Sequence, residues 1–416
     1  MNARYLAVEL IHGVLTKQAY ANLSLKQRLD EARPIDRGLI TQLVYGTLQN
    51  QIYCRNRWKK HVQKEPDALV ASLLDMCVYQ LMFLDKVPDY AVLDEAQSIL
   101  RQKHRGSATG LINAVLRKVI EEGKIDIEHE DEIERVALNT SLPTWILKMW
   151  VKQYGKEDAL KCAYSLIQNV QTSIKVNPLK ASRKEMLDDP RFLPGKLVED
   201  ALRYQGNFLE SEWFKDGKGI LQDEASQMVV SWVDAKPGME ILDLCAAPGT
   251  KTAGMAFAMR NTGRIVALDL HEHRVRLIQE GMLKLGVTIV EPFACDSRDC
   301  ASVLQDRRFD AVLADVPCSG LGVLRRKPDI KARIRPSDLD DLQLLQGQLL
   351  EEAGKRVKAG GVLVYSTCTL NKKENQVQVA SFLKNNEEFI LVRERTIFPY
   401  EQETDGFYIA QMQRNP

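Results

Sequence analysis

The chain lacks paired cysteines. None of its eight cysteines forms a CxxC pair, and none has a histidine at a spacing typical of zinc ligands. This scatter disfavours a zinc site and a disulfide framework, so we expect reduced thiols and no bound metal. A reduced thiol can pack as a small apolar side chain or act as a nucleophile, and its surroundings decide which.

Long apolar runs and net charge are also scarce. No run approaches the ~20 residues that a membrane helix needs, and the first residues show no signal-peptide pattern. We therefore expect a cytoplasmic protein with no membrane partner. With a formal net charge of only +1, any surface that binds a polyanion must come from local clusters of cations. No feature predicts an obligate oligomer, so a monomer is expected.

The N-terminal part has a helical pattern. With 416 residues the chain is longer than one ordinary domain, and two or three are expected. Residues 1–127 carry apolar side chains at spacings of three and four, which predicts an all-helical domain. Two clusters within it, 55–60 and 101–105, interleave cations with polar or aromatic residues. Each cluster could neutralise phosphates or form a solvated helix face, and the sequence favours neither.

The remainder divides into two further parts. Residues 121–134 are rich in charge and lack periodicity, which predicts a linker. Residues 135–219 combine a helix that starts near Pro143 with an alternating strand at 172–177, as in a small α/β subdomain. From residue 220 to 416, short apolar strands alternate with amphipathic helices. This alternation is typical of a mostly parallel, Rossmann-like α/β sheet that is covered on both faces.

Five apolar strands of this last domain end at polar or reactive residues. They are expected at 239–244, 264–268, 288–293, 311–314 and 361–365. The carboxyl ends of parallel strands lie at one edge of the sheet, where ligands collect. The sequence therefore predicts a site at this edge.

The turn after the first of these strands predicts a cofactor site. Its small residues at 245–250 let the backbone approach a ligand, but it has neither the GxGxxG pattern nor the P-loop spacing. Asp269, at the end of the next strand, can accept the ribose hydroxyls of a nucleoside, and Asp296 can meet the adenine amino group. These features indicate an adenosine-containing cofactor without a pyrophosphate, which points to S-adenosylmethionine. A single acid at a strand end would be weak evidence, but Asp269, Asp296 and Asp315 follow in order.

Several motifs closely resemble those of RNA 5-methylcytosine methyltransferases. They are DLCAAPG at 243–249 with Lys251 and Thr252, DVPCSG at 315–320, RRKPD at 325–329, and YSTCT at 365–369 followed by Glu374 and Asn375. Segments 36–48, 79–83 and 110–117 resemble the helical NusB-like RNA-binding fold. The strand at 172–177 resembles the start of the RNA-recognition-like subdomain that precedes the catalytic domain in certain rRNA methyltransferases. The resemblance covers nearly the whole chain.

The resemblance implies roles for particular residues. Carbon 5 of cytosine is a poor nucleophile, so a thiolate must first add to carbon 6, and the resemblance assigns that attack to Cys368. Asp315 would bind the pyrimidine edge at nitrogen 3, and Cys318 would act in product release. The substrate implied is a cytosine of small-subunit (16S) rRNA, splayed out of its stack. The cofactor-binding residues implied are Cys245, Ala246, Ala247, Pro248, Gly249, Thr250, Lys251, Asp269, Asp296 and Asp315, and the RNA-binding residues are Arg325, Arg326 and Lys327.

Thr250 departs from the family pattern. It stands where a second glycine is usual, and a threonine would be strained there if the backbone required a positive φ. Val316 also departs from the commoner alanine or proline, a mild packing change. Two alternatives stay open: a tRNA cytosine-5 methyltransferase, and a NusB-like RNA-binding or assembly factor with a vestigial catalytic domain. For Cys245, Cys295 and Cys300 the sequence favours a structural role.

Overall fold

The computed structural model describes residues 2–416, and the chain divides into two compact units. The first contains the chain up to Gln168 together with Leu324–Ile334, and the second contains Asn169–Val323 and Arg335–Pro416. Residues 135–168, which the sequence pattern assigned to the middle subdomain, thus belong to the first unit. Among residues 2–416, no helix is long and apolar enough to cross a membrane.

The first unit is built from helices, which confirms the all-helical domain expected from the apolar spacing. Its core gathers side chains from α1 through α7. The helices are α1 (Ala3–Lys17), α2 (Ala21–Arg28), α3 (Arg37–Gln49), α4 (Gln51–Lys59), α5 (Ala68–Phe83), α6 (Asp89–Gln102), α7 (Thr109–Glu122), α8 (Glu132–Asn139), α9 (Thr144–Tyr154), α10 (Lys156–Ser165) and α17 (Ile330–Arg333).

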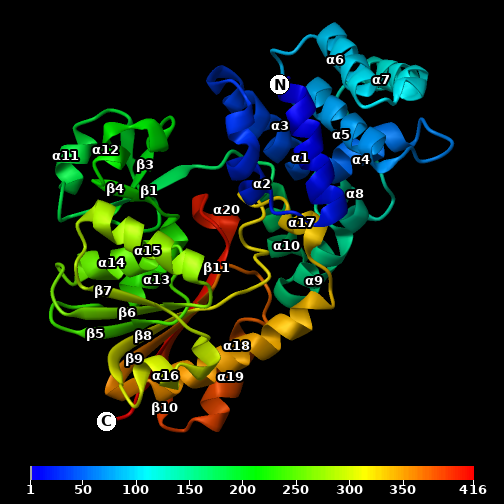
Figure 1. Ribbon diagram of the computed structural model, residues 1–416. Coiled ribbons are helices and arrows are strands. Elements are labelled where there is room, and N and C mark those ends of the chain that lie inside the picture. Colours follow the sequence, from blue (N-terminus) through cyan, green and yellow to red (C-terminus); the bar gives the residue numbers. More distant parts are fainter. Residues whose placement is uncertain (1) are drawn as a thin grey trace. The chain divides into compact units, whose positions relative to one another are not determined.

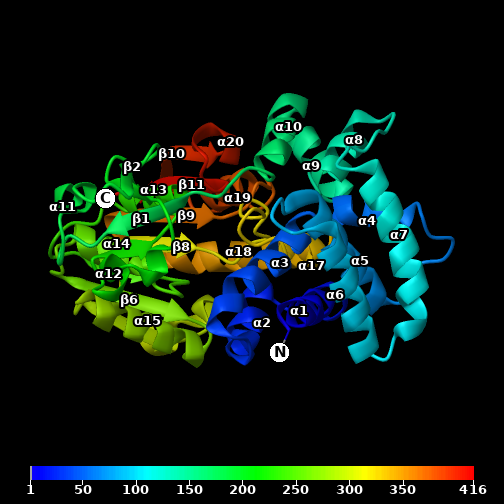
Figure 2. The same cartoon turned by 90° about the horizontal axis from the view of Figure 1, so that it is seen from above.

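Helix α5 lies at the centre of this unit. The Asp67 carboxylate caps its first turn by accepting the backbone N–H groups of Leu69 and Val70 at 3.1 and 3.2 Å. The helix is buried on almost every side, as its nearly continuous apolar sequence requires. It packs against α1, α3, α4, α6 and α7, and Figure 2 shows α7 running beside it. Each fully buried Leu or Val of this helix contributes about 1.5–3 kcal/mol to stability.

The basic cluster at 55–60 is partly structural. Arg55 Nη2 lies 2.7 Å from a carboxylate oxygen of Asp75, a residue of α5 that is fully buried. The Arg57 side chain is 1% exposed and donates to Glu122 at 2.8 Å. Within this cluster only Lys59 and Lys60 are exposed. The two arginines therefore hold α4 against neighbouring helices, because a buried cation needs such partners.

The second unit contains a small antiparallel sheet. Its strands lie in the order β2-β3-β1-β4, and the strand expected at 172–177 is its β1, which pairs with both β3 and β4. Ile174, Leu202 and Phe208 are buried in the core beneath it. The elements are β1 (Thr172–Val176), α11 (Arg183–Leu187), β2 (Phe192–Pro194), β3 (Ala201–Tyr204), α12 (Glu212–Lys215) and β4 (Gly219–Leu221).

The larger sheet of this unit has seven strands in the order β10-β11-β9-β8-β5-β6-β7. The five strands expected from the sequence are parallel neighbours, which confirms the Rossmann-like domain. The antiparallel strands β10 and β11 were not expected. The strands are β5 (Glu240–Asp243), β6 (Arg264–Asp269), β7 (Val290–Ala294), β8 (Phe309–Asp315), β9 (Val357–Thr367), β10 (Phe389–Ile397) and β11 (Phe407–Arg414).

Helices cover both faces of the seven-stranded sheet (Figure 1). Helices α13, α14 and α15 lie on one face, and α16, α18 and α19 lie on the other. The sheet core between these layers includes Leu242, Val312 and Leu363, all fully buried. The helices are α13 (Glu224–Trp232), α14 (Thr250–Ala258), α15 (Glu272–Leu285), α16 (Ala301–Leu304), α18 (Asp338–Lys355), α19 (Gln376–Asn385) and α20 (Pro399–Gln402).

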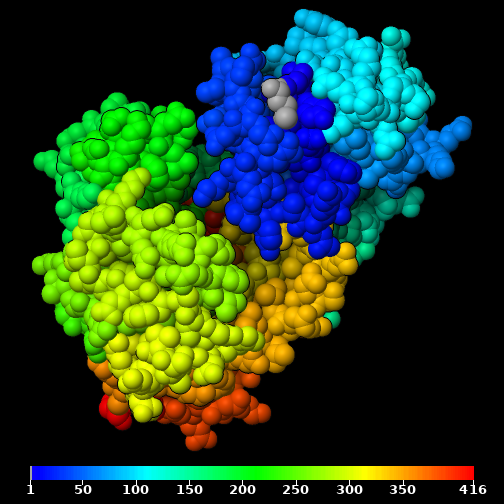
Figure 3. Space-filling view, viewed as in Figure 1, coloured from blue at the N-terminus to red at the C-terminus, as the bar shows by residue number. Residues whose placement is uncertain are grey.

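Helix α15 packs against the turn after β5, which is expected to hold the cofactor. It ends at Leu285 and is followed by Gly286, whose φ of 74° is the left-handed conformation common after a helix. The outer side of α15 forms part of the surface in Figure 3, and its Leu283 is 84% exposed. Its inner side presents Ile278 and Met282, and a Cβ added at Gly249 would lie 3.3 Å from Met282 Cε. The turn after β5 is therefore packed directly on this helix.

Candidate active site

Two thiols meet at the carboxyl edge of the large sheet. Cys318 lies in the loop after β8, Cys368 follows β9, and their Sγ atoms are 3.3 Å apart. Because β8 and β9 are adjacent and parallel, their ends bring the two loops together. The hydrogen bond to Cys368 and burial raise the pKa of the Cys318 thiol well above its usual value. The two loops therefore hold both thiols within hydrogen-bond distance of each other.

Backbone contacts fix the two loops to each other. The Gly322 N–H donates to the Cys368 carbonyl at 3.0 Å, and the Gly406 N–H donates to the Gly322 carbonyl at 2.8 Å. A Cβ added at Gly322 would lie 1.9 Å from the Gly406 carbonyl oxygen. Only glycine allows this approach, so the sequence GLG after Cys318 has a packing function that its motif alone did not reveal.

Asp315 ends β8 and has a partner on each carboxylate oxygen. Lys251 Nζ lies 2.7 Å from Oδ2, and the Ser366 hydroxyl donates to Oδ1 at 2.6 Å. Lys251 Nζ also lies 5.4 Å from the centroid of the Phe407 ring. Burial lowers the pKa of Lys251, but the charge and hydrogen bond of Asp315 outweigh it, so the pKa is raised. The pair is an ammonium and a carboxylate whose orientation is fixed.

The turn after β5 resolves the question raised by Thr250. Gly249 has the positive φ, 98°, while Thr250 is the first residue of α14 and is not among the residues with positive φ. The peptide bond before Pro248 is cis. The Thr252 hydroxyl donates to Asp243 Oδ2 at 2.7 Å, which links the helix start to the end of β5. The threonine at 250 is therefore unstrained.

Asp269 ends β6 beside this turn. Its side chain is 4% exposed, and its Oδ2 accepts the Ala247 N–H at 3.3 Å. Arg274 Nη1 lies 3.4 Å from the same oxygen. The structure thus brings Asp269 to the small-residue turn, as expected for neighbouring parallel strands.

The three remaining cysteines of the sheet domain lie in less reactive surroundings. Burial, with the nearby charge of Asp243, raises the pKa of Cys245 well above its usual value. Burial raises the pKa of Cys300 to about 12, and its Sγ donates to Glu352 at 3.3 Å. The pKa of Cys295 is also raised by burial. A thiol with a raised pKa is a poor nucleophile, so the structure supports packing functions for all three.

Known proteins resemble this chain over its whole length. A family model described as 16S rRNA methyltransferase RsmB/F matches residues 230–413, and a model of the NusB family matches residues 1–121. The probable ribosomal RNA small subunit methyltransferase B of Bacillus subtilis (strain 168) is 37% identical over 443 residues, covering 99% of each chain. The chain belongs to the ribosomal RNA small subunit methyltransferase B family.

Solved structures share the fold of this chain. The crystal structure of PH0851 superposes with a TM-score of 0.84 and 25% identity, covering 100% of this chain and 99% of that one. NSun6 from Pyrococcus horikoshii with SFG has a TM-score of 0.61 and 20% identity, covering 66% of this chain and 98% of that one. At this lower identity the similarity concerns the fold alone. The Rossmann-like methyltransferase domain and the NusB domain expected for the family are both present.

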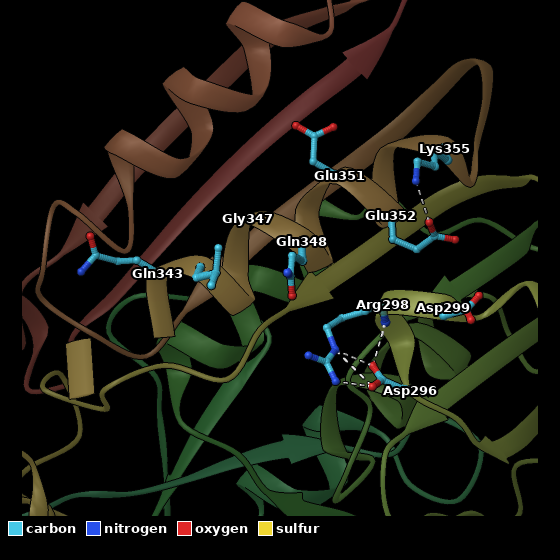
Figure 4. Close-up of a pocket in the computed structure, with 10 residues that line it drawn as sticks. Asp296, Arg298, Asp299, Gln343, Gly347, Gln348, Glu351, Glu352 and Lys355 are labelled. Atoms are coloured by element: carbon cyan, nitrogen blue, oxygen red, sulfur yellow. Dashed lines mark hydrogen bonds and ion pairs between the residues drawn. The ribbon is translucent and has the colours of Figure 1, made fainter. Parts of the chain in front are cut away.

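Asp296 follows β7 and lies in an open cleft of the second unit. The cleft has a volume of about 760 Å³ and lies between the turn at 296–299 and helix α18 (Figure 4). Arg298 Nε donates to both carboxylate oxygens of Asp296 at 2.9 and 3.1 Å, and this guanidinium holds the pKa of Asp296 below its usual value. Asp296 is therefore an ionised acceptor that already has a cationic partner.

The basic segment after the Cys318 loop belongs to the first unit. Arg325 is 8% exposed, Arg326 is half-buried and Lys327 is exposed. Farther along, Lys331 Nζ donates to the Gln49 carbonyl at 2.6 Å, and the Arg333 guanidinium lies 3.8 Å from the Tyr20 ring centroid. Of the three cations predicted to meet RNA, only Lys327 is exposed.

Some residues of the site were missed by the sequence analysis. Ser366 and Phe407 contact Asp315 and Lys251, and Gln346 and Ser319 surround Glu374. Ser319, Ser366 and Glu374 stood inside recognised motifs, which was the only available signal for them. Gln346 lies in a helix with no motif, and only the three-dimensional contact identifies it. Among residues 2–416, no cluster of His, Cys, Asp and Glu could hold a metal ion.

Proposed function

We propose that this protein transfers a methyl group to carbon 5 of a cytosine in small-subunit rRNA, through a covalent bond between Cys368 and the base. The observation that carries the proposal is the pair of thiols 3.3 Å apart beside Asp315. Family membership supports the methyl transfer, and the name of the Bacillus subtilis relative supports the rRNA substrate.

The residues around the turn after β5 fit an adenosine-containing cofactor. Gly249 has the positive φ that the tight turn requires, and Asp269 presents a buried carboxylate beside the turn. Asp243 Oδ1 is buried with no hydrogen-bond partner in the protein, so a donor is missing there. S-adenosylmethionine, when bound, supplies an electrophilic methyl group. Residues 245–251, Asp269 and Asp296 would hold it.

Cys368 acts first on the base. Its thiolate forms a bond to carbon 6, and the electrons of the double bond between carbons 5 and 6 make carbon 5 nucleophilic. Asp315, held in place by Lys251, would bond the pyrimidine edge at nitrogen 3, where the negative charge that develops on thiolate addition collects. After methylation, a base takes the proton from carbon 5, the electrons of that C–H bond re-form the double bond to carbon 6, and the bond from carbon 6 to Cys368 Sγ breaks to release the thiolate. Cys318 acts in this last step.

The alternative of a vestigial catalytic domain loses its main support. That alternative depended on strain at Thr250, and Thr250 begins α14 without a positive φ. The contact between Cys318 and Cys368 and the pairing of Asp315 with Lys251 support a working site. We therefore advance the catalytic function alone.

Two substitutions test the proposal. Transfer of tritiated methyl groups to small-subunit RNA is measured for the parent and for Cys368→Ser, which we expect to lose at least 100-fold in rate. Cys318→Ala should instead form the bond to RNA and fail to break it, which gives a protein–RNA band that survives denaturing electrophoresis. Full turnover by Cys368→Ser would show that another residue is the nucleophile. Loss of activity in Cys318→Ala without such a band would remove Cys318 from the release step.

A further inference from the structure

Glu374 is a buried carboxylate on which four donors converge. It is 0% exposed and follows Cys368 in the loop after β9. Its Oε2 accepts the Ser319 backbone N–H at 2.9 Å and Gln346 Nε2 at 3.0 Å. Its Oε1 accepts the Ser319 hydroxyl at 2.6 Å and Asn371 Nδ2 at 2.9 Å. Two carboxylate oxygens offer about four acceptor positions, so the donors match the capacity of the group.

These donors come from both sides of the thiol pair. Ser319 is next to Cys318 in sequence, and its hydroxyl lies 2.6 Å from the Thr369 hydroxyl, next to Cys368. Gln346, from α18, also donates to the Pro317 carbonyl at 2.9 Å, so it holds the other side of Cys318. The Glu374 backbone is held in turn by the Tyr365 hydroxyl, which donates to its carbonyl at 2.7 Å. Glu374 thus joins the β8 loop, the β9 loop and α18.

We propose that Glu374 is a positioning residue that holds the Cys318 loop against the Cys368 loop and so keeps the two thiols in contact. It bonds Ser319, the neighbour of Cys318, directly and reaches Thr369, the neighbour of Cys368, through the Ser319 hydroxyl, while bonding neither thiol. Its importance for turnover rests on the proposed function, in which one thiol attacks and the other assists release. Its effect on the distance between the thiols is independent of that function.

The substitution Glu374→Gln tests this role with little change of shape. An amide replaces one acceptor oxygen by an NH₂ group, which then faces donors instead of accepting from them. The swap Glu374→Gln with Asn371→Asp restores the match, because the new amide can donate to the carboxylate introduced at position 371 while its oxygen still faces the Ser319 N–H and Gln346. That introduced carboxylate can also accept the Lys373 N–H, which Asn371 accepts at 3.2 Å in the parent. We expect the single variant to lose the close contact between the two thiols and the double variant to regain it.

Proximity of the thiols is measured without RNA or cofactor. Diamide removes two electrons and two protons from a pair of thiols, forms the S–S bond and is itself reduced to the hydrazine. We expect the parent to form a Cys318–Cys368 disulfide, identified by peptide mass spectrometry, at least tenfold faster than Glu374→Gln. The double variant should return to within about threefold of the parent rate.

A matched control separates positioning from general destabilisation. Glu224 is also 0% exposed and accepts four donors, namely Lys196 N, Leu197 N, Val198 N and Arg203 Nε. Glu224→Gln should lower the melting temperature by an amount similar to Glu374→Gln while leaving the rate of disulfide formation unchanged.

The outcomes separate the two proposals. Equal rates in the parent and in Glu374→Gln would overturn the positioning role, and so would a parent that forms no such disulfide. In methyl-transfer assays, Glu374→Gln should accumulate more RNA adduct per product released than the parent does. If the rates of disulfide formation change as expected but no variant or parent transfers methyl groups, the proposed function is wrong and the positioning role of Glu374 stands.

Discussion

At the scale of single residues, two carboxylates at neighbouring strand ends have opposite environments. Asp315 accepts from Lys251 and Ser366 and is a quarter exposed. Asp243 is 1% exposed and accepts from the Thr252 hydroxyl, while its second oxygen has no partner in the protein. Burial therefore raises the pKa of Asp243 to about 7, from its usual 3.8. The two side chains differ in what surrounds them, although both end an apolar strand.

Asp243 should make the stability of the protein depend on pH. Between the unfolded pKa of 3.8 and the folded value of about 7, the unfolded chain releases the proton that the folded protein retains. Its contribution to stability is thus complete below pH 4 and is lost as the pH rises through about 7. Asp243→Asn cannot ionise, so we expect it to gain about 1–3 kcal/mol relative to the parent between pH 5 and pH 8.

The measurement is urea unfolding of both proteins at pH 5, 6, 7 and 8. The exposed Asp306 provides a control, because Asp306→Asn removes one carboxylate from the surface without a burial change. A difference between Asp243→Asn and the parent that stays constant over this range would show that the buried carboxyl is ionised throughout. The sign of the slope also matters, since a gain that shrinks as the pH rises would contradict the raised pKa.

The residue scale also shows what sequence motifs reveal. Cys318, Cys368 and Asp315 could be selected because each stood in a recognisable motif at a strand end, and the structure brings them together. Lys251 was expected at the cofactor, yet it bonds Asp315 at 2.7 Å. That contact joins a residue of α14 to one of β8, 64 positions apart in sequence. A sequence motif shows which side chains are reactive. Which of them contact one another depends on which strands are neighbours in the sheet.

At the scale of secondary structure, the parallel core was predictable and the antiparallel end was not. The five parallel strands are short apolar runs between helices, a pattern that is visible in sequence. Strand β10 has the sequence FILVRERTI without regular alternation, and Ile390, Leu391 and Val392 are 51%, 40% and 51% exposed. An edge strand lacks the buried faces that produce a clear pattern. The neighbouring β11 nevertheless brings Phe407 to Lys251 and follows Gly406.

Gly322, in the loop after β8, and Gly406, just before β11, are in close backbone contact. Gly322→Ala would place a Cβ 1.9 Å from the Gly406 oxygen and 2.9 Å from the Cys368 oxygen, both backbone atoms. The Cys318 loop must then move away from the Cys368 loop. We expect a loss of about 1–3 kcal/mol in stability and at least a tenfold loss of methyl transfer. Thermal unfolding and the tritium assay measure the two effects.

Gly281→Ala is the matched control for that substitution. Gly281 lies within α15, and a Cβ there would meet nothing within 4 Å. Alanine favours a helix over glycine by about 1 kcal/mol, so this variant should be as stable as the parent or more so, with unchanged activity. If Gly322→Ala behaved like Gly281→Ala, the loop contact would have no role in the site.

At the scale of the whole molecule, the chain alternates between its two units. The segment Leu324–Ile334 belongs to the helical unit although it lies between two parts of the sheet unit in sequence. The cluster at 325–327 was predicted to contact RNA because of its charge, and the burial of Arg325 could not be predicted from charge alone. The same holds for Arg55 and Arg57, which bond carboxylates of the helical unit. Lys59, Lys60 and Lys327 are exposed, and of these Lys59 lies 3.6 Å from Glu65 and Lys60 lies 2.8 Å from Glu122.

The NusB family match in the helical unit bears on which RNA is the substrate. Bisulfite conversion of RNA from a strain that lacks this gene, compared with its parent strain, locates every cytosine whose protection is lost. We expect one cytosine of small-subunit rRNA to lose protection, and the intact gene to restore it. A gene that encodes Cys368→Ser should restore the folded protein but not the methylated cytosine. That result would assign the methylation to the Cys368 thiol. If only tRNA cytosines lost protection, rRNA would be excluded as the substrate. The proposed reaction of the two cysteines would still stand, because the same cysteine pair can act on either RNA and only the RNA-binding surfaces would differ.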